Sequence, residues 1–347
     1  MPTQNELTKR KEEHLRLCSS EAVAFKNLSS GFEHYSFIHY ALTEVDIDSI
    51  ELKSDFFGTE VNYPFFISCM TGGTADSVNI NLKLAGAARR LNIPLGLGSQ
   101  RYALGNNNFN DHFNRIREVA GDIPLIGNIG AAQVVEPDFI ENLEKLIETS
   151  HIQAFAIHLN PAQELFQKEG ETNFSGLLTA IARIKKSVKI PLIVKETGAG
   201  ISAQCADELL WVGVDMIDVA GAGGTSWSGV EILRNGGDNS HDFWDWGLPT
   251  AYCVRTINEL RHRYDFALTA SGGINSGMEV AKALALGADF TSSARRVLRA
   301  LNEKGEAGVV EMAEDWFDTV RKVMFLTGSP TLDEFRMGKI VRKEELI

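Results

Sequence analysis

The chain has 347 residues, of which 44% are hydrophobic and 23% charged, a composition typical of a soluble globular protein with a large core. Its formal net charge of −12 excludes a general attraction for nucleic acid or for an anionic membrane surface. Any anionic substrate must therefore be held by a local cluster of cations.

The cysteines and the N-terminal residues indicate a reducing compartment. Cys18, Cys69, Cys205 and Cys253 are far apart and form no CxxC pair, so they indicate neither a disulfide framework nor a zinc site. The stretch MPTQNELTKRKEEHL lacks the apolar region of a signal peptide. No run approaches the roughly 18 apolar residues of a membrane span. We expect a cytoplasmic protein with no membrane or nucleic-acid partner.

The first 60 residues differ from the rest of the chain. They carry many charges and few long apolar runs, with a helix predicted at 7–18 and a short strand at 47–52. We assign 1–60 to an N-terminal arm and 61–347 to a separate domain. The arm is expected to close over that domain, either in its own subunit or in a neighbouring one.

From residue 63 onward, apolar strand-like runs alternate with helical periodicity. Helices are predicted at 79–91, 136–150 and 277–288, and the longest interval between strands holds a Gly/Ser/Asn/Asp-rich insertion at 226–247. Apolar strands that alternate with helices indicate a parallel sheet, and eight of them favour a closed (β/α)8 TIM barrel over an open doubly wound sheet. The eight runs are FFISCM at 65, PLGLGS at 94, PLIGNIG at 124, AFAIHLN at 154, PLIVKET at 191, MIDVAGAGG at 216, ALTASGG at 267 and DFTSSA at 289.

Polar residues or glycines end nearly every predicted strand. Barrel enzymes build the active site from the C-terminal strand ends, so these groups should converge in space. The last two ends, SGGINSG (271–277) and SSARR (292–296), are typical of a phosphate site, because free N–H groups at a helix N-terminus bind phosphate. Two tight turns with a helix cap are the alternative.

Cations are predicted at the barrel mouth. Lys195, late in an apolar strand, could face a ligand that becomes anionic, such as reduced flavin, or could extend to solvent. Arg10 and His14 lie four residues apart on one helical face with Lys11 beside them, a pattern that an ordinary surface helix also produces. Arg101 follows the second strand and should face the mouth.

The stretch HLNPAQE (158–164) is the most polar strand end. Asn160 and Gln163 suit diphosphate oxygens or a flavin edge, and Glu164 could hold Mg²⁺ or simply favour the helix dipole. Glu231 could face the same cavity or could be a solvated charge. His158 is explained nearly as well by a hydrogen-bonded core histidine.

Nine motifs in order resemble one family, type 2 isopentenyl-diphosphate isomerase, over residues 10 to about 300. This resemblance implies an FMN-dependent TIM barrel of isoprenoid biosynthesis that interconverts isopentenyl and dimethylallyl diphosphate. It also implies FMN in reduced form, NADPH as a usual reductant, and Mg²⁺. The motifs are RKEEH (10–14), MTGGT (70–74), GSQR (98–101), NIGA (128–131), HLNPAQE (158–164), VKETGAGIS (194–202), VAGAGGTSW (219–227), DWGLPT (245–250) and SGGINSGMEVAKALALGAD (271–289).

Site residues follow from the resemblance by motif. Glu164 matches the metal ligand, and Gln163, Lys195 and Glu231 match groups at the reacting end. Two departures are Asn275, where the family often has a basic residue, and Ser293, where glycine is common. Implied FMN contacts are Met70, Thr71, Gly72, Ser99, Asn128, Lys195, Thr225, Gly272, Gly273, Ala294 and Arg295. Implied substrate contacts are Arg10, Lys11, His14, Ser99, Arg101, Asn160, Gln163 and Trp227.

The reaction implied by the resemblance shifts a double bond without net redox change. An unactivated alkene is a poor base and an allylic C–H a poor acid, so reduced flavin is a better proton carrier than a side chain. The rivals are an FMN barrel that oxidises α-hydroxy acids and a non-enzymatic flavin- or phosphate-binding barrel. We also expect a homo-oligomer, a tetramer or an octamer.

Overall fold

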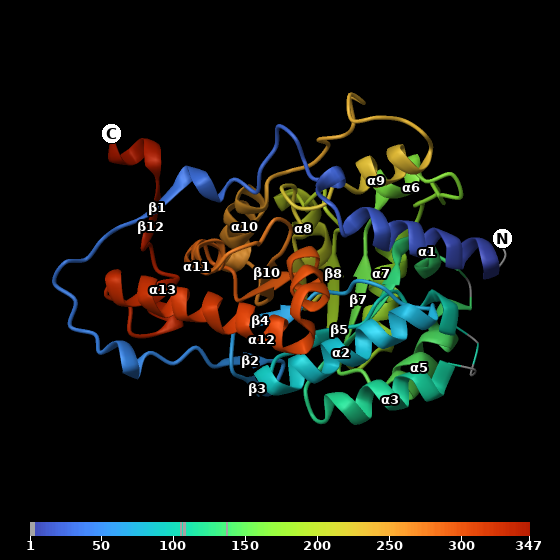
Figure 1. Ribbon diagram of the computed structural model, residues 1–347, viewed down its shortest axis with the longest axis horizontal. Helices are drawn as coiled ribbons and strands as arrows, with labels where there is room; N and C mark the ends of the chain where they lie inside the picture. The colour runs from blue at the N-terminus through green and yellow to red at the C-terminus, as the bar shows by residue number, and fades with distance from the viewer. Residues whose placement is uncertain (1–3, 105, 107–108, 137) are drawn as a thin grey trace.

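The computed structural model describes residues 4–104, 106, 109–136 and 138–347. Its centre is a closed barrel of eight parallel strands, which follow one another in chain order until β11 pairs with β4 (Figure 1). All eight predicted runs contribute a strand, so the predicted TIM barrel is confirmed. The strands are β4 (Phe65–Ile67), β5 (Leu95–Gly96), β6 (Leu125–Gly130), β7 (Ala154–His158), β8 (Leu192–Lys195), β9 (Met216–Asp218), β10 (Ala267–Ala270) and β11 (Phe290–Ser293).

Helices cover the outside of the barrel. α2 follows β4 and begins with a capping box, in which Thr74 and Ser77 each accept a hydrogen bond from the other's backbone N–H. The segments predicted as helical at 79–91, 136–150 and 277–288 fall on α2, α5 and α11, although position 137 lies outside the described residues. The helices are α2 (Ala75–Leu91), α3 (Asn110–Ala120), α4 (Ala131–Val134), α5 (Phe139–Ser150), α6 (Pro161–Phe166), α7 (Leu177–Ser187), α8 (Ala203–Trp211), α9 (Trp227–Arg234), α10 (Thr250–Asn258), α11 (Gly277–Ala285), α12 (Arg295–Leu326) and α13 (Leu332–Phe335).

A short hairpin closes the N-terminal end of the barrel. It consists of β2 (Ser54–Phe56) and β3 (Thr59–Val61), so it spans the boundary drawn between 1–60 and 61–347. Phe56 and Val61 are buried in the same cluster as Phe66, which projects into the barrel interior. This end of the barrel is therefore filled by packed apolar side chains, and the opposite, C-terminal end remains for chemistry.

The N-terminal arm wraps around the barrel. It begins with α1 (Gln4–Cys18), which lies beside α6 and α9, and continues to β1 (Tyr35–Phe37) on the far side of the molecule (Figure 1). There β1 pairs antiparallel with β12 (Ile340–Arg342), so the two ends of the chain hold each other. The arm then returns beneath the barrel to the β2–β3 hairpin. The helix predicted at 7–18 is confirmed as part of α1.

Two local predictions are wrong or incomplete. The strand predicted at 47–52 is instead a 3-10 turn, Ile47–Ser49, because the Asp46 carboxylate accepts a hydrogen bond from the N–H of Asp48. The insertion at 226–247 is not all loop, since α9 occupies its first part. In the part of the chain that is described, no helix is both long and apolar enough to cross a membrane.

Candidate active site

Parallel register brings polar strand ends together at the C-terminal end of the barrel. His158 of β7 is the register partner of Lys195 of β8, which is in turn the partner of Asp218 of β9. Lys195 and Asp218 are buried, with 7% and 1% of their surface exposed. Three neighbouring strands therefore end in polar groups that lie side by side, and Lys195 does not extend to solvent.

His158 serves as a fixed, neutral side chain in this layer. Its Nδ1 lies 2.9 Å from Oδ1 of Asn128, which can only accept, so the histidine Nδ1–H is the donor. Burial, with the positive charge of Lys195, lowers the pKa of His158 to about 3. This is the hydrogen-bonded core histidine that the sequence left open, and it orients the Asn128 amide.

The turn after β7 arranges the HLNPAQE side chains. Pro161 starts α6, where its missing N–H is no loss, and Asn160 at the N-cap does not use its side chain as a cap. The Asn160 amide instead donates to Gln163 Oε1 at 3.1 Å and to Glu164 Oε1 at 2.9 Å. Gln163 Nε2 then donates to Glu231 Oε1 at 3.3 Å, so the orientation of the Gln163 amide is fixed at both ends.

Glu164 is held in place by three donors. Besides Asn160, its carboxylate accepts from Gln167 Nε2 at 3.3 Å and from the backbone N–H of Glu171 at 2.8 Å. Asn160 Oδ1 is buried and has no hydrogen-bond partner among the described residues. One carboxylate beside one free amide oxygen fits Mg²⁺, which takes its remaining ligands from water and phosphate oxygens. No group of three His, Cys, Asp or Glu arranged for a metal occurs in the described ranges.

Glu231 is buried, contrary to its interpretation as a solvated charge. Ser226 caps α9 by accepting from the Gly229 N–H, which sets the helix start and turns Glu231 inward. The carboxylate is 0% exposed and contacts His14 Nε2 at 2.7 Å and Arg234 at 2.5 Å. Burial opposes ionisation, but the hydrogen bond from His14 and the charge of Arg234 outweigh it and lower the pKa of Glu231.

α1 reaches the barrel mouth at two points. His14 packs its ring edge-on against Trp227, with centroids 5.2 Å apart, while it bonds to Glu231. Three residues earlier, Lys11 Nζ donates to the carbonyl oxygen of Gly72 and lies 4.9 Å from the centre of the Tyr102 ring. A predicted substrate residue therefore touches a predicted FMN residue. The arm of this chain closes over its own barrel.

Three cations gather at the mouth. Burial, with the charges of Arg10 and Arg101, lowers the pKa of Lys11 to about 8. Burial also lowers the pKa of Arg10, while the charge of Glu164 opposes the shift and that of Arg101 adds to it. Arg101 is tied to Glu171 at 2.6 Å. Like charges this close cost free energy in the empty protein, which favours binding of an anion between them.

Glycines bring two loops into contact after β9 and β10. Gly272 and Gly273 have φ of +91° and +72°, and a Cβ at Gly272 would overlap the carbonyl oxygen of Gly221. Ser293 Oγ donates to Ile274 O at 2.9 Å, and Asn275 Nδ2 donates to Gly273 O at 2.9 Å. The two departures from the family pattern therefore brace the backbone of this corner.

The other predicted FMN residues surround this corner and the strand ends. Thr225 forms a β-bridge with Ala24 of the arm, and Thr71 is buried after β4. Met70, Ser99 and Ala294 follow β4, β5 and β11 at the same end of the barrel.

Arg295, like Asn160, has a buried polar atom without a hydrogen-bond partner among the described residues. It starts α12 and lies 3.6 Å from Glu21 of the arm, yet its Nη1 is buried without a hydrogen-bond partner among the described residues. Asp218 Oδ2 is likewise buried and unpartnered. Buried polar atoms without partners are rare unless a ligand satisfies them. A basic group beside the glycine corner, with Lys195 in the floor of the mouth, fits a phosphorylated flavin.

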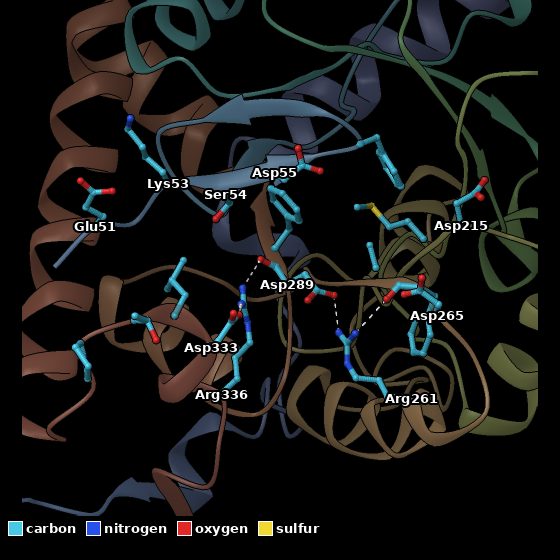
Figure 2. Close-up of a pocket in the computed structure, with 18 of the residues that line it drawn as sticks. Glu51, Lys53, Ser54, Asp55, Asp215, Arg261, Asp265, Asp289, Asp333 and Arg336 are labelled. Carbon is cyan, nitrogen blue, oxygen red and sulfur yellow. Dashed lines mark hydrogen bonds and ion pairs between the residues drawn. The ribbon is translucent and has the colours of Figure 1, made fainter.

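Two cavities lie away from this site. One of about 990 Å³ is at the N-terminal ends of β9–β11, where Arg261 pairs with Asp289 (Figure 2). Another of about 790 Å³ lies between the arm and the start of α10. Neither contains a predicted catalytic residue, and the first is at the end of the barrel that serves stability.

Sequence reasoning missed three residues of the site. Asp218 lies inside the run MIDVAGAGG, where the glycines draw attention to the strand end, although a lone Asp in an apolar strand is itself a usable sign. Arg234 was detectable from its spacing, since it follows Glu231 by three residues on one helix. Glu171, which anchors Arg101, lies in a loop without periodicity, and nothing in the sequence pointed to it.

Comparison with known proteins agrees with this geometry. The model of the FMN-dependent dehydrogenase family matches residues 3–104 and 141–342. An isopentenyl-diphosphate delta-isomerase of Pelodictyon phaeoclathratiforme is 39% identical over 97% of both chains. Another, of Thermococcus onnurineus, is 42% identical over 96% of this chain and 90% of its own length. The chain belongs to the isopentenyl-diphosphate delta-isomerase family.

This membership confirms the resemblance seen in the motifs. The flavin-binding domain of baker's yeast flavocytochrome b2 superimposes with a TM-score of 0.70 over 98% of this chain and 88% of its own, at 16% identity. An identity that low supports the barrel fold alone. The sequence relatives, rather than this structural neighbour, separate the isomerase family from the oxidases.

Proposed function

We propose that this protein interconverts isopentenyl and dimethylallyl diphosphate, using reduced FMN as an acid/base cofactor, NADPH as its reductant and Mg²⁺ for the diphosphate. The observation that carries the proposal is the group of three mutually repelling cations at the barrel mouth: Arg10, Lys11 and Arg101. In a chain of net charge −12, such a group needs an anion to balance it. A diphosphate supplies that charge.

Mg²⁺ would bind at the edge of the cation group. Glu164 offers a carboxylate, and the unpartnered Oδ1 of Asn160 offers a second oxygen. Their shared hydrogen bond of 2.9 Å keeps the two ligands in a fixed relation. The ion would add positive charge to the diphosphate without a proton equilibrium of its own.

The hydrocarbon end of the substrate would lie deeper, toward Lys195. Reduced FMN supplies the proton transfer that no side chain is suited to. Gln163, fixed between Asn160 and Glu231, would orient the reacting carbons. Glu231 is fully buried and hydrogen-bonded to His14, so it would relay protons together with that imidazole, which offers both a donor and an acceptor nitrogen. Trp227 and His14 would exclude water from that side.

The residues proposed for the site all come from one chain, because α1 contacts the barrel of its own subunit through Lys11 and His14. The predicted homo-oligomer, a tetramer or an octamer, is therefore not needed to assemble it. A cytoplasmic location agrees with the reducing conditions that a reduced flavin requires.

The test is an isomerase assay on purified protein whose visible spectrum has first established its flavin content. Activity is expected only after NADPH or dithionite reduces the flavin, and only with Mg²⁺ present. Consumption of NADPH or O₂ in proportion to product would instead support an oxidase. A reduced, flavin-loaded protein that leaves isopentenyl diphosphate unchanged would refute the proposal.

A further inference from the structure

Asp218 is a buried carboxylate in the floor of the barrel mouth that the mechanism above does not use. It ends β9, lies next to Lys195 in the sheet register, and has 1% of its surface exposed. Ser271 Oγ donates to its Oδ1 at 2.5 Å, whereas Oδ2 has no hydrogen-bond partner among the described residues. One carboxylate oxygen of Asp218 is therefore unpaired near Lys195, the side chain that would stabilise the negative charge of reduced flavin.

Lys195 and Asp218 are neighbours that do not form a direct ion pair. Lys195 Nζ donates to the backbone carbonyl oxygen of Glu196 at 2.5 Å. Within the described ranges, no carboxylate oxygen lies within 4.0 Å of Lys195 Nζ. Burial raises the pKa of the Asp218 carboxyl, and the charge of Lys195 and the hydrogen bond from Ser271 oppose that rise. In its ionised form, Asp218 makes a short dipole with Lys195 across the floor.

A fixed dipole in a buried site acts strongly on any charge that forms above it, because little water screens it. A positive group stabilises a flavin that gains negative charge on reduction, and a nearby carboxylate has the opposite effect. The ratio of oxidised to reduced flavin therefore depends on both groups together, and not on Lys195 alone.

We propose that Asp218 is a positioning residue that offsets part of the positive charge of Lys195 and so sets the reduction equilibrium of the bound flavin. This inference rests on the proposed function, in which Lys195 faces the flavin. Ser271 tunes the effect, because its hydrogen bond favours the ionised form of the carboxyl.

The test is a reductive titration of the FMN-loaded protein against a reference dye, which measures the flavin potential without turnover. Asp218→Asn removes the negative charge at nearly constant shape, and reduction should become at least tenfold more favourable, a shift of about 30 mV for two electrons. Ser271→Ala removes a hydrogen bond that favours the ionised carboxyl and should shift the equilibrium the same way, by a smaller factor. Asp265→Asn, an exposed carboxylate at the other end of the barrel, is the control.

An equilibrium constant for flavin reduction that rises by less than tenfold in Asp218→Asn, at full FMN content, overturns this inference. If that variant does not fold or bind FMN, Ser271→Ala decides, since an unchanged potential there also overturns it. If the wild-type protein isomerises its substrate but the variants have an unchanged potential, only this inference fails. If the wild-type protein binds no flavin, the proposed function itself fails.

Discussion

His14 Nε2 lies 2.7 Å from Oε1 of Glu231, and this contact joins the N-terminal helix α1 to α9, the helix after the sixth barrel strand. The two residues are 217 positions apart, and the contact excludes solvent from the carboxylate. The hydrogen bond from the arm also helps to lower the pKa of this buried acid. Arg234 and Gln163 contact the same carboxylate, so four side chains share one arrangement.

His14→Ala and Glu231→Gln should both impair turnover, by different amounts. A hydrogen bond to a buried charge contributes roughly 1.5–3 kcal/mol, so His14→Ala should reduce kcat/KM by about 10–100-fold. Glu231→Gln also leaves Arg234 without its buried partner and should cost more. Steady-state kinetics on reduced protein measures both. Arg16→Ala, an exposed change on the same helix, should leave kcat/KM within about twofold.

The lowered pKa of Lys11 predicts that kcat/KM depends on pH. Its pKa is about 8, because it is buried beside Arg10 and Arg101, so Lys11 is charged at pH 7 and loses its charge as the pH rises through 8. If this charge holds the diphosphate, kcat/KM should fall by up to tenfold per pH unit above 8, since this parameter reports groups of the free enzyme. Lys11→Arg should abolish the alkaline fall. A wild-type profile that stays flat to pH 9.5 would contradict the assignment.

The barrel was predictable from the sequence, but the coupling of its parts was not. Eight apolar runs identify the strands because a parallel sheet buries both faces. The burial of Glu231 was not predictable, since a carboxylate four residues into a helix looks the same whether His14 covers it or water does. The strand predicted at 47–52 does not form, because the hydrogen bond to Asp46 that stabilises the turn at Ile47–Ser49 outweighs a short apolar alternation.

Lys195→Ala should reduce flavin binding or turnover strongly. The side chain is buried in the polar layer, and its loss removes the positive charge nearest to Asp218. We expect an FMN dissociation constant at least tenfold higher, or a turnover at least a hundredfold lower, measured by fluorescence titration and by assay. Near-normal activity at full FMN content would remove Lys195 from its assigned role.

Glu164→Gln should raise the Mg²⁺ concentration that supports half-maximal activity. The change keeps the shape of the side chain but removes the charge that Mg²⁺ prefers, and we expect at least a tenfold increase in that concentration. A metal titration at saturating substrate measures it. Glu148→Gln, on the exposed face of α5, serves as the control. An identical titration for Glu164→Gln and wild type would exclude Glu164 from the metal site.

Phe56 and Phe57 offer a matched test of the hairpin that closes the barrel. Phe56 is 2% exposed and packs edge-on against Phe290 with ring centroids 5.4 Å apart, whereas its neighbour Phe57 is 37% exposed. Phe56→Ala should lower the free energy of unfolding by about 3–5 kcal/mol, because it leaves a cavity beneath the barrel core. Phe57→Ala should lower it by less than about 1 kcal/mol. Chemical denaturation of the two variants compares them directly, and equal losses would show that the hairpin does not seal the barrel through Phe56.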